Sequence, residues 1–379
     1  MKDNMDNSNL GWSRRKFIIS ATGAGTAIVL SPFSSWASSS KEFDPRIAKI
    51  VAKTFGIDTH SHMDVPYRKE EFIGQKYNLA EQMKISGLTA VCMTFQVDRP
   101  DLTKEGEAYE RFNTCLDEMD EILKRNDINR ALNLNDLKKA KKENKPIVIQ
   151  SVEGGHFIEG EIERIAIAYN RGVRHLGLLH DNQSLIPLGD IYTDTPRFGG
   201  LTEMGKKVIR ECNSLGILID LTHCSNDTIN DALQLSTKPI IISHTGLDTQ
   251  LGNDPKMSKM MRPRLISEKQ AKIVAKSGGV IGVWTHLAES PMEYAQNIKA
   301  MVNTIGIDHV CLGTDTKMVV PEGFIKRQGG TTNTAWKEQK EGFYYVVVDA
   351  LLKTGFNQND IEKIGGGNYL RVFDAATKK

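Results

Sequence analysis

Apolar positions along this chain fall into eight short runs, separated by longer stretches in which apolar residues recur at three-to-four spacing. Each run is long enough for one buried strand, and near-continuous apolar runs are typical of strands covered on both faces. The predicted strands are Thr54–His60, Leu88–Phe95, Pro146–Glu153, Val173–His180, Gly216–His223, Lys238–His244, Gly279–Thr285 and His309–Asp315.

The stretches between these runs predict amphipathic helices. Several of them begin with a residue suited to capping a helix, and Thr202, Ser225 and Ser267 are the predicted N-caps. The clearest helices are Glu161–Arg171, Thr202–Leu215, Asn226–Leu235, Ser267–Lys276 and Met292–Ile305. Near the end of the chain, Asn368 is predicted to cap the last helix after a turn at Gly365–Gly367.

Eight repeats of strand and helix indicate parallel strands with right-handed crossovers, which close into an α/β barrel of the (β/α)₈ TIM type. We expect this barrel to form a single domain, with the charged segment Asp98–Asn144 as a helical excursion after the second strand. An open doubly wound sheet is the alternative, but no glycine-rich dinucleotide turn follows the first strand.

The N-terminal segment predicts export rather than a part of the barrel. Arg14 and Arg15 precede a weakly apolar stretch from Ile18 to Leu30, and small residues up to Ala37 offer a cleavage site. This pattern resembles a bacterial twin-arginine signal. We therefore expect a signal peptide at 1–37, a barrel domain at 38–379, and a periplasmic or cell-envelope location with no stable membrane anchor after cleavage. An uncleaved N-terminal anchor is the alternative.

Composition narrows the classes of function. The 379 residues include 49 basic and 47 acidic ones, and removal of residues 1–37 leaves the two signs balanced. Nucleic-acid binding by bulk charge is therefore not expected. Five cysteines without a CxxC pair exclude a dense disulfide framework and a cysteine zinc knuckle.

Side chains that bind metals stand at the ends of six predicted strands. In a parallel barrel all strand carboxyl ends open onto one face, so these side chains should converge there. Buried strands otherwise avoid charged groups, because an unpaired ionised group in an apolar core is costly. The residues are His60, His62, Glu153, His180, His223, His244 and Asp315, and His286 follows the seventh strand as a further candidate for the pocket.

The spacing within this set predicts a two-metal centre. His60 and His62 lie two residues apart, so both project from one face of a strand and can hold one ion. Glu153 has two oxygens and can bridge to a second ion, held by His223 and His244. Imidazole and carboxylate ligands together suit two Zn²⁺ ions, and other divalent transition metals are compatible with them.

Several motifs resemble the membrane (renal) dipeptidase family of zinc peptidases, within the amidohydrolase-like superfamily of metal-dependent hydrolases. They extend from about Phe55 to Phe373 in the order of the family. They are Ser151–His156, Gly172–His180, Gly216–His223, Ile241–Thr245 and Gly367–Phe373.

The resemblance implies hydrolysis of dipeptides, including those with a C-terminal D-residue, by a hydroxide that bridges two metals. It assigns Glu153 as the bridging carboxylate, and His223 and His244 as ligands of the second zinc. It implies that His180 contacts the scissile group, that Arg264 (with Arg262 as a competitor) holds the substrate carboxylate, and that Asp315 is the acid–base group. The expected partners are small peptides and, as a possible assembly, a second copy of the chain in a homodimer.

One departure from the family pattern leaves the first metal ligand open. The family has His-x-Asp at the first strand, whereas this chain reads His60-Ser61-His62-Met63-Asp64. Alignment from the upstream side gives His60 and His62, and alignment from the downstream side gives His62 and Asp64. We prefer the first, because the strand fixes the phase from upstream, and an imidazole in place of a carboxylate then makes the site more positive.

Two other functions are kept as alternatives. Asp58–Asp64 also resembles the opening of TatD-type metal nucleases, although the chain has no basic surplus to hold phosphates. A non-catalytic metal-containing binding protein is the third possibility.

Overall fold

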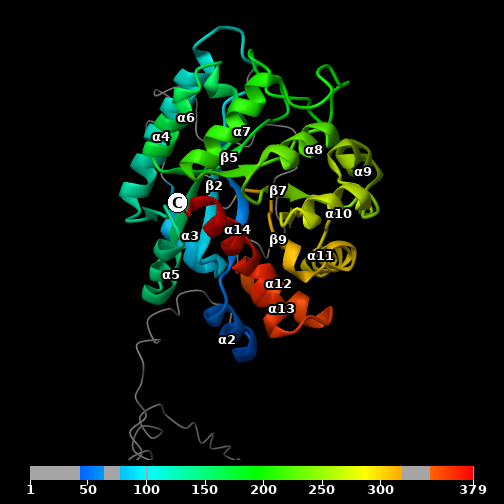
Figure 1. Cartoon of the computed structure of the whole chain (residues 1–379). Helices are drawn as coiled ribbons and strands as arrows, with labels where there is room; N and C mark the ends of the chain where they lie inside the picture. The colour runs from blue at the N-terminus through cyan, green and yellow to red at the C-terminus, as the bar shows by residue number, and fades with distance from the viewer. Residues whose placement is uncertain (1–42, 64–76, 100, 318–341, 379) are drawn as a thin grey trace, which may run out of the picture. The chain divides into compact units, whose positions relative to one another are not determined.

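Eight parallel strands close on themselves into a barrel in the computed structural model, which describes residues 43–63, 77–99, 101–317 and 342–378 (Figure 1). Each strand pairs with the next one in the chain, and β9 pairs with β1 to complete the ring. All eight are buried almost throughout, which confirms the prediction from their apolar runs. They are β1 (Ile57–His62), β2 (Ala90–Gln96), β4 (Ile147–Glu153), β5 (Val173–Gly177), β6 (Leu218–Asp220), β7 (Ile241–Thr245), β8 (Val280–Val283) and β9 (Val310–Leu312).

Helices surround the barrel, and the predicted caps of three of them are confirmed. The side chains of Thr202, Ser225 and Ser267 each accept a hydrogen bond from the backbone N–H three residues later. The helices are α2 (Pro45–Lys53), α3 (Leu79–Ser86), α4 (Glu107–Arg125), α5 (Leu134–Glu143), α6 (Glu163–Asn170), α7 (Glu203–Leu215), α8 (Asn226–Leu235), α9 (Pro255–Met261), α10 (Glu268–Lys276), α11 (Pro291–Ile305), α12 (Phe343–Lys353), α13 (Gln358–Glu362) and α14 (Asn368–Thr377).

The excursion after the second strand consists of α4 and α5, as predicted. It also contains the two-residue strand β3 (Asn129–Arg130), which pairs with the start of β4 outside the closed ring. The 19-residue α4 covers the barrel with an apolar face that includes Phe112 and Leu116. Amphipathic spacing therefore places this segment in the helical layer rather than in solvent.

The first predicted strand begins too early. Its first residue, Thr54, instead ends α2, where its hydroxyl donates to the Ile50 carbonyl at 2.9 Å. Thr54 is β-branched, a residue type that is common in strands. Its hydroxyl instead satisfies a carbonyl oxygen in the last turn of the helix. The strand begins at Ile57 and continues to His62.

The predicted cap at Asn368 is wrong. Residues Lys363–Gly367 form a π-helical turn that runs directly into α14. Asn368 is buried and its amide donates to the carbonyls of Ile307 and Val310 at 2.7 and 2.8 Å. A Cβ on Gly365 would lie 2.1 Å from the Tyr344 hydroxyl oxygen, so this glycine permits a close packing contact rather than a turn.

Helix α14 closes the amino end of the barrel. It packs against β6, β8 and β9, and Figure 1 shows it in front of the strands. Its Tyr369 and Phe373 are fully buried in a cluster with Ile57 and Ile241, the first residues of β1 and β7. The opposite, carboxyl end is therefore the one left for polar side chains.

The predicted signal segment 1–37 lies outside the described residues. Among the residues that the structure describes, none of the helices has the length and apolar character needed to cross a membrane.

Candidate metal centre

Glu153 lies at the middle of the carboxyl end of the barrel. It is the last residue of β4 and its side chain is 3% exposed. Five imidazoles surround it, each with its Nε2 within 4 Å of a carboxylate oxygen. The separations are 3.4 Å for His60, 3.8 Å for His62, 3.4 Å for His180, 2.9 Å for His223 and 3.7 Å for His244. The convergence expected from the strand ends is thus present around one carboxylate.

The first strand contributes both of its histidines to this centre. The ring centroids of His60 and His62 are 4.8 Å apart. His62 Nε2 lies 2.8 Å from Asp315 Oδ1, closer than to Glu153, and His60 Nε2 lies 3.8 Å from the same oxygen. Asp64, the alternative ligand, lies outside the described residues. His60, His62 and Asp315 therefore form one group able to hold an ion.

Three of the site residues lie beyond the strands that predicted them. His180, His223 and Asp315 each follow the last residue of their strand by three positions. His223 and Asp315 adopt φ angles of 67° and 54°, in the left-handed region that side-chain-bearing residues seldom enter. Such strain is found at functional sites when the surrounding structure enforces it. Here it turns both side chains inward over the barrel.

The expected second pair, His223 and His244, is also brought together. Their Nε2 atoms are 3.2 Å apart, a distance at which two imidazole nitrogens share at most one proton. Two overlapping groups around Glu153 could hold an ion. One consists of Glu153, His60 and His244, and the other of Glu153, His180 and His223. The structure thus places Asp315 and His180 among the possible ligands, beyond the set predicted from the sequence.

Among the predicted metal ligands, two polar atoms lack a hydrogen bond, and a metal would satisfy both. Within the described part of the chain, His60 Nε2 and Glu153 Oε2 are buried without a hydrogen-bond partner. A buried polar atom without a partner costs free energy, so such atoms in a native site require an explanation. Imidazole nitrogen and carboxylate oxygen are the donors that Zn²⁺ takes in catalytic sites. The residues present therefore fit a divalent metal.

The electrostatics of the protein groups also favour a cation. Burial raises the pKa of Glu153, but the charges of His180 and His60 and a hydrogen bond from His223 outweigh it, and the pKa falls well below its usual value. For Asp315, burial is likewise outweighed by the neighbouring imidazoles, His244 first and then the hydrogen-bonded His286, which lower the pKa. Both carboxylates are therefore anionic.

The two histidines of the second pair differ in charge. Burial lowers the pKa of His223, but hydrogen bonds to Asp181 and Glu153 outweigh it and raise the pKa to about 10. Burial and the charge of His60 hold the pKa of His244 well below its usual value. His244 is thus a neutral imidazole with a lone pair available to a metal, whereas His223 exchanges a proton for one.

His180 is held by a carboxylate that the sequence analysis missed. Its Nδ1 lies 2.7 and 2.8 Å from the two oxygens of Asp98, a fully buried residue two positions after β2. The His180 charge and hydrogen bond lower the pKa of Asp98 despite its burial. This pair orients His180 so that its Nε2 faces Glu153. The rule that strand ends meet at one face, applied to residues just past each strand, would have found Asp98.

Arg264 is connected to the centre through Asp181, which sequence reasoning also missed. Arg264 Nη2 donates to Asp181 Oδ2 at 2.9 Å, and Arg99 pairs with the same carboxylate. Asp181 Oδ1 lies 3.2 Å from His223 Nδ1, so one carboxylate joins the arginine to a metal ligand. Arg262, the competitor of Arg264, is exposed. The signal for Asp181 was its position beside His180.

Asp315 is flanked by imidazoles on both sides. His62 Nε2 lies 2.8 Å from Oδ1, and His286 Nε2 lies 2.5 Å from Oδ2. His286, which follows β8, is therefore part of the centre rather than a distant lining residue. Two nitrogens fix the orientation of the carboxylate and hold it deprotonated, the state required of a group that accepts a proton.

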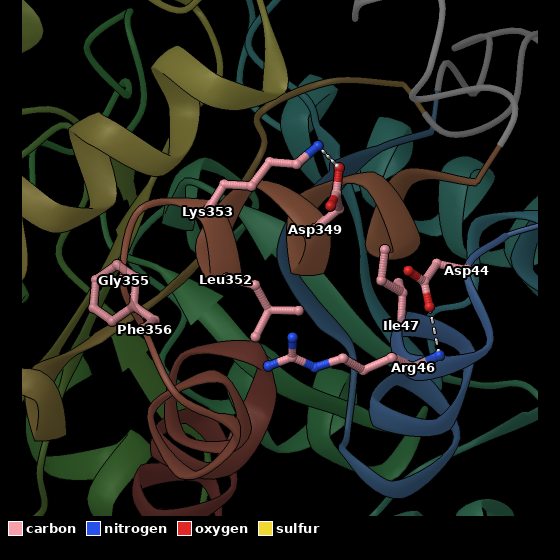
Figure 2. Close-up of a pocket in the computed structure, with 8 residues that line it drawn as sticks. All are labelled: Asp44, Arg46, Ile47, Asp349, Leu352, Lys353, Gly355 and Phe356. Carbon is pink, nitrogen blue, oxygen red and sulfur yellow. Dashed lines mark hydrogen bonds and ion pairs between the residues drawn. The ribbon is translucent and has the colours of Figure 1, made fainter.

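The described residues also form a pocket outside this centre. This pocket, between α2 and α12, is drawn in Figure 2, and none of the histidines described above lines it. Its charged groups make local contacts, with Lys353 paired to Asp349 at 2.6 Å and Asp44 capping α2. Its lining residues are Asp44, Arg46, Ile47, Asp349, Leu352, Lys353, Gly355 and Phe356. This pocket therefore lacks the cluster of histidines and carboxylates found at the carboxyl end of the barrel.

Curated dipeptidases are similar to this chain in sequence. In sequence, the chain is 26% identical over 230 residues to dipeptidase 3 of Mus musculus, covering 59% of this chain and 43% of the relative. It is 28% identical over 236 residues to dipeptidase verJ of Clonostachys rogersoniana, covering 59% and 54%. The chain thus spans about half the length of the curated relatives that it matches.

Solved structures share the fold at low sequence identity. An amidohydrolase from Pseudomonas aeruginosa superposes with a TM-score of 0.71 at 22% identity, covering 88% of this chain and 99% of that one. A metallo peptidase from Rhodobacter sphaeroides, liganded with a phosphinate mimic of the dipeptide L-Ala-D-Ala, gives 0.66 at 16% identity, covering 85% and 99%. These likenesses establish the barrel.

The family itself is established by sequence. The model described as membrane dipeptidase (peptidase family M19) matches residues 45–379, nearly the whole barrel and its preceding helix. This match confirms the resemblance noted in the strand-end motifs. The chain belongs to the membrane dipeptidase family, peptidase family M19.

Proposed function

We propose that this protein is a dipeptidase that uses two zinc ions held by His60, His62, Glu153, His223 and His244. The observation that carries the proposal is the arrangement of five imidazoles around one buried carboxylate, with an arginine at the edge of the same centre. Two such ions would lower the pKa of a water held between them and polarise the scissile carbonyl.

Asp315 is the proposed acid–base group. Its carboxylate is anionic between His62 and His286, so it can accept the proton of the attacking water and then deliver it to the leaving amine. His180 is the proposed contact of the scissile group. Because Asp98 accepts the Nδ1 proton, the ring is fixed with Nε2 toward the reacting centre, where it can donate to the carbonyl oxygen.

Arg264 supplies the proposed recognition of the substrate's free carboxylate. A guanidinium has five N–H donors in a planar fork, and Arg264 donates one at Nη2 to Asp181, so others can bind a carboxylate. In a dipeptide the free carboxylate belongs to the residue next to the scissile bond. In a longer peptide cleaved at its first bond, that position is occupied by another peptide bond, which Arg264 would not bind as a carboxylate. The preference for dipeptides follows from that geometry.

A C-terminal D-residue is part of the proposal. The Rhodobacter sphaeroides relative binds a phosphinate mimic of L-Ala-D-Ala, and the present chain shares its fold. Dipeptides of this stereochemistry are therefore the first substrates to test.

We further propose export to the periplasm or cell envelope, on the basis of Arg14 and Arg15. Replacement of both by lysine should retain the protein in the cytoplasmic fraction.

The test of activity uses the purified chain reconstituted with zinc. It should release amino acids from Gly-D-Ala and from Gly-L-Ala, but not from the amide of either dipeptide or from a tripeptide. Single-stranded DNA is offered in parallel, because a nuclease of the same superfamily would release nucleotides. Release of nucleotides without release of amino acids would mean that the protein is a nuclease and not a dipeptidase. Zinc uptake with neither product would favour a binding protein.

Asp315→Asn separates catalysis from folding in the same assay. It should lower kcat by roughly 10²–10⁴-fold, the usual contribution of a general acid–base group. Full activity in this variant would remove Asp315 from the mechanism.

A further inference from the structure

One hydroxyl lies between two of the predicted metal ligands. Ser243, in the middle of β7, is fully buried, and its Oγ lies 3.2 Å from His60 Nδ1 and 3.0 Å from His244 Nδ1. In the two-metal assignment predicted from the sequence, His60 holds the first ion and His244 the second, and the same two rings with Glu153 also form one of the groups that could hold an ion. The serine therefore contacts Nδ1, the ring nitrogen that points away from Glu153, on one predicted ligand of each metal.

The hydrogen-bond partners of this hydroxyl can all be satisfied by one assignment of donors and acceptors. The third neighbour of Ser243 Oγ is Thr222 Oγ1, at 3.3 Å. Thr222 Oγ1 donates its own proton to Asp220 Oδ1 at 2.6 Å, and it accepts from the Ser243 backbone N–H at 2.8 Å. An ionised carboxylate only accepts, so the threonine proton is committed to Asp220. The remaining acceptor site of Thr222 can then receive the serine proton.

This leaves two lone pairs on Ser243 Oγ for two imidazole nitrogens. In this assignment each Nδ1 carries a proton and donates it to the serine. The lone pair of each ring lies on Nε2, the atom that faces Glu153 at 3.4 Å for His60 and 3.7 Å for His244. Neutral imidazole in this tautomer is the form that binds a metal through Nε2.

We propose that Ser243 is a positioning residue that sets the tautomer of both His60 and His244 and so links the affinities of the two metal sites. The inference rests on the metal-holding part of the proposed function and is independent of the substrate. It differs from the role of Asp181, which contacts Nδ1 of His223 alone among these ligands. Ser243 thus contacts a predicted ligand of both metal sites, whereas Asp181 contacts a predicted ligand of one site only.

The experiment measures zinc stoichiometry and both stepwise dissociation constants by chelator competition. Ser243→Ala removes the hydroxyl without adding volume, and it should weaken zinc binding at both sites by roughly 10–100-fold, the usual effect of losing such a partner. Asp181→Asn is the matched comparison and should weaken one site by a similar factor while leaving the other unchanged. Circular dichroism and thermal unfolding establish that each variant is folded.

A second variant tests the direction of the hydrogen bonds. Thr222→Val removes the acceptor of the serine proton, which is then free to point at one imidazole nitrogen. The zinc affinity of one site should fall about 10-fold, while the serine still accepts a hydrogen bond from the imidazole of the other site. Should Ser243→Ala also be unstable, this variant carries the test, because its serine and both imidazoles remain in place.

Three results would overturn the inference. The first is a Ser243→Ala variant that binds two zinc ions as tightly as the wild type. The second is a Ser243→Ala variant in which only one site is weakened, which would assign the serine to one histidine. A wild-type chain that takes up no zinc would overturn both this inference and the metal centre. Conversely, two bound zinc ions without hydrolysis of any dipeptide would remove the proposed activity alone.

Discussion

The two ends of this barrel are built from the same eight strands, yet they differ in nearly every physical property. At the amino end, the first residues of the strands, such as Ile57 and Ile241, pack with Tyr369 and Phe373 of α14 in a sealed apolar cluster. At the carboxyl end, histidines and carboxylates converge on Glu153. One end buries apolar surface, and the other holds unsatisfied polar atoms and left-handed residues.

The contrast shows how a strained site can persist in a stable fold. Polar atoms without partners and positive φ angles at His223 and Asp315 both cost free energy. Burial of large side chains at the opposite end offsets that cost. A band of buried polar residues between the two ends, including Asp58 and Asp220, joins the strands by hydrogen bonds such as the one from Thr314 Oγ1 to Asp58 at 2.7 Å.

The largest expected effect comes from the centre of the carboxyl end. Glu153→Gln preserves the shape of the side chain but removes the charge that faces five imidazoles. We expect loss of bound zinc and a fall in kcat/KM of about 10³-fold or more, since metal ions supply several kcal/mol of transition-state stabilisation. Metal analysis and dipeptide kinetics measure it. Retention of two zinc ions would contradict the bridging role.

The corresponding change at the amino end should affect stability and leave the chemistry intact. Phe373 is fully buried beneath the strands, so Phe373→Ala should lower the free energy of unfolding by about 3–5 kcal/mol. Urea denaturation measures this loss. The molecules that remain folded should keep the wild-type kcat/KM, and a large fall in activity per folded molecule would show that the two ends are coupled.

A smaller effect is expected at the edge of the metal centre. Arg264→Gln should raise KM for dipeptides, with a fall in kcat/KM of roughly 10–100-fold, because one charged hydrogen-bonding partner of the substrate carboxylate is lost. Arg262→Gln is the matched control, since Arg262 is a neighbouring exposed arginine. Equal losses in the two variants would mean that the arginines act through general charge rather than through recognition by Arg264.

The smallest effect is a pH dependence at the amino end. Lys141 Nζ donates to the carbonyls of Val51 and Thr54, at 3.2 and 2.5 Å, and burial lowers its pKa to about 8 from an ordinary 10.5. Between these values the unfolded chain holds a proton that the folded chain has released. The free energy of unfolding of the wild type should therefore rise with pH over this range, relative to that of Lys141→Met.

Urea titrations of both proteins at pH 7.5 and pH 9.5 measure that difference directly. Other groups that titrate in this range, such as buried tyrosines, are common to the two proteins and cancel. A constant difference between the proteins would place the Lys141 ammonium in a fully hydrated setting.

Periodicity was sufficient to predict the barrel, because each strand is buried on both faces and therefore appears as an apolar run. The ligand-type residues were predicted by the same logic, since polar groups at the ends of buried strands have few other reasons to be there. Strand boundaries were less well predicted. Thr54 fits a strand by composition, and only its bond to the Ile50 carbonyl shows that it ends α2.

The residues missed from the sequence are those whose role depends on a neighbour. Asp98 and Asp181 are ordinary acidic residues in loops until folding places them beside His180 and His223. Ser243 is one more small residue in a strand until His60, 183 positions away, is brought against its hydroxyl. The rule about strand ends and the position beside His180 could have marked Asp98 and Asp181 as candidates, but no local pattern shows which imidazole each side chain contacts.

By itself, the sequence determined the closed barrel, its family and the set of histidines and carboxylates at the carboxyl end. These depend on residue type and strand phase, which are local properties. Only the tertiary structure decided which of those side chains face Glu153 and which carboxylate orients each imidazole. It also decided that one serine lies between two metal ligands. Such relations arise when strands far apart in the chain meet, because hydrogen-bond direction and distance exist only between atoms that folding has brought into contact.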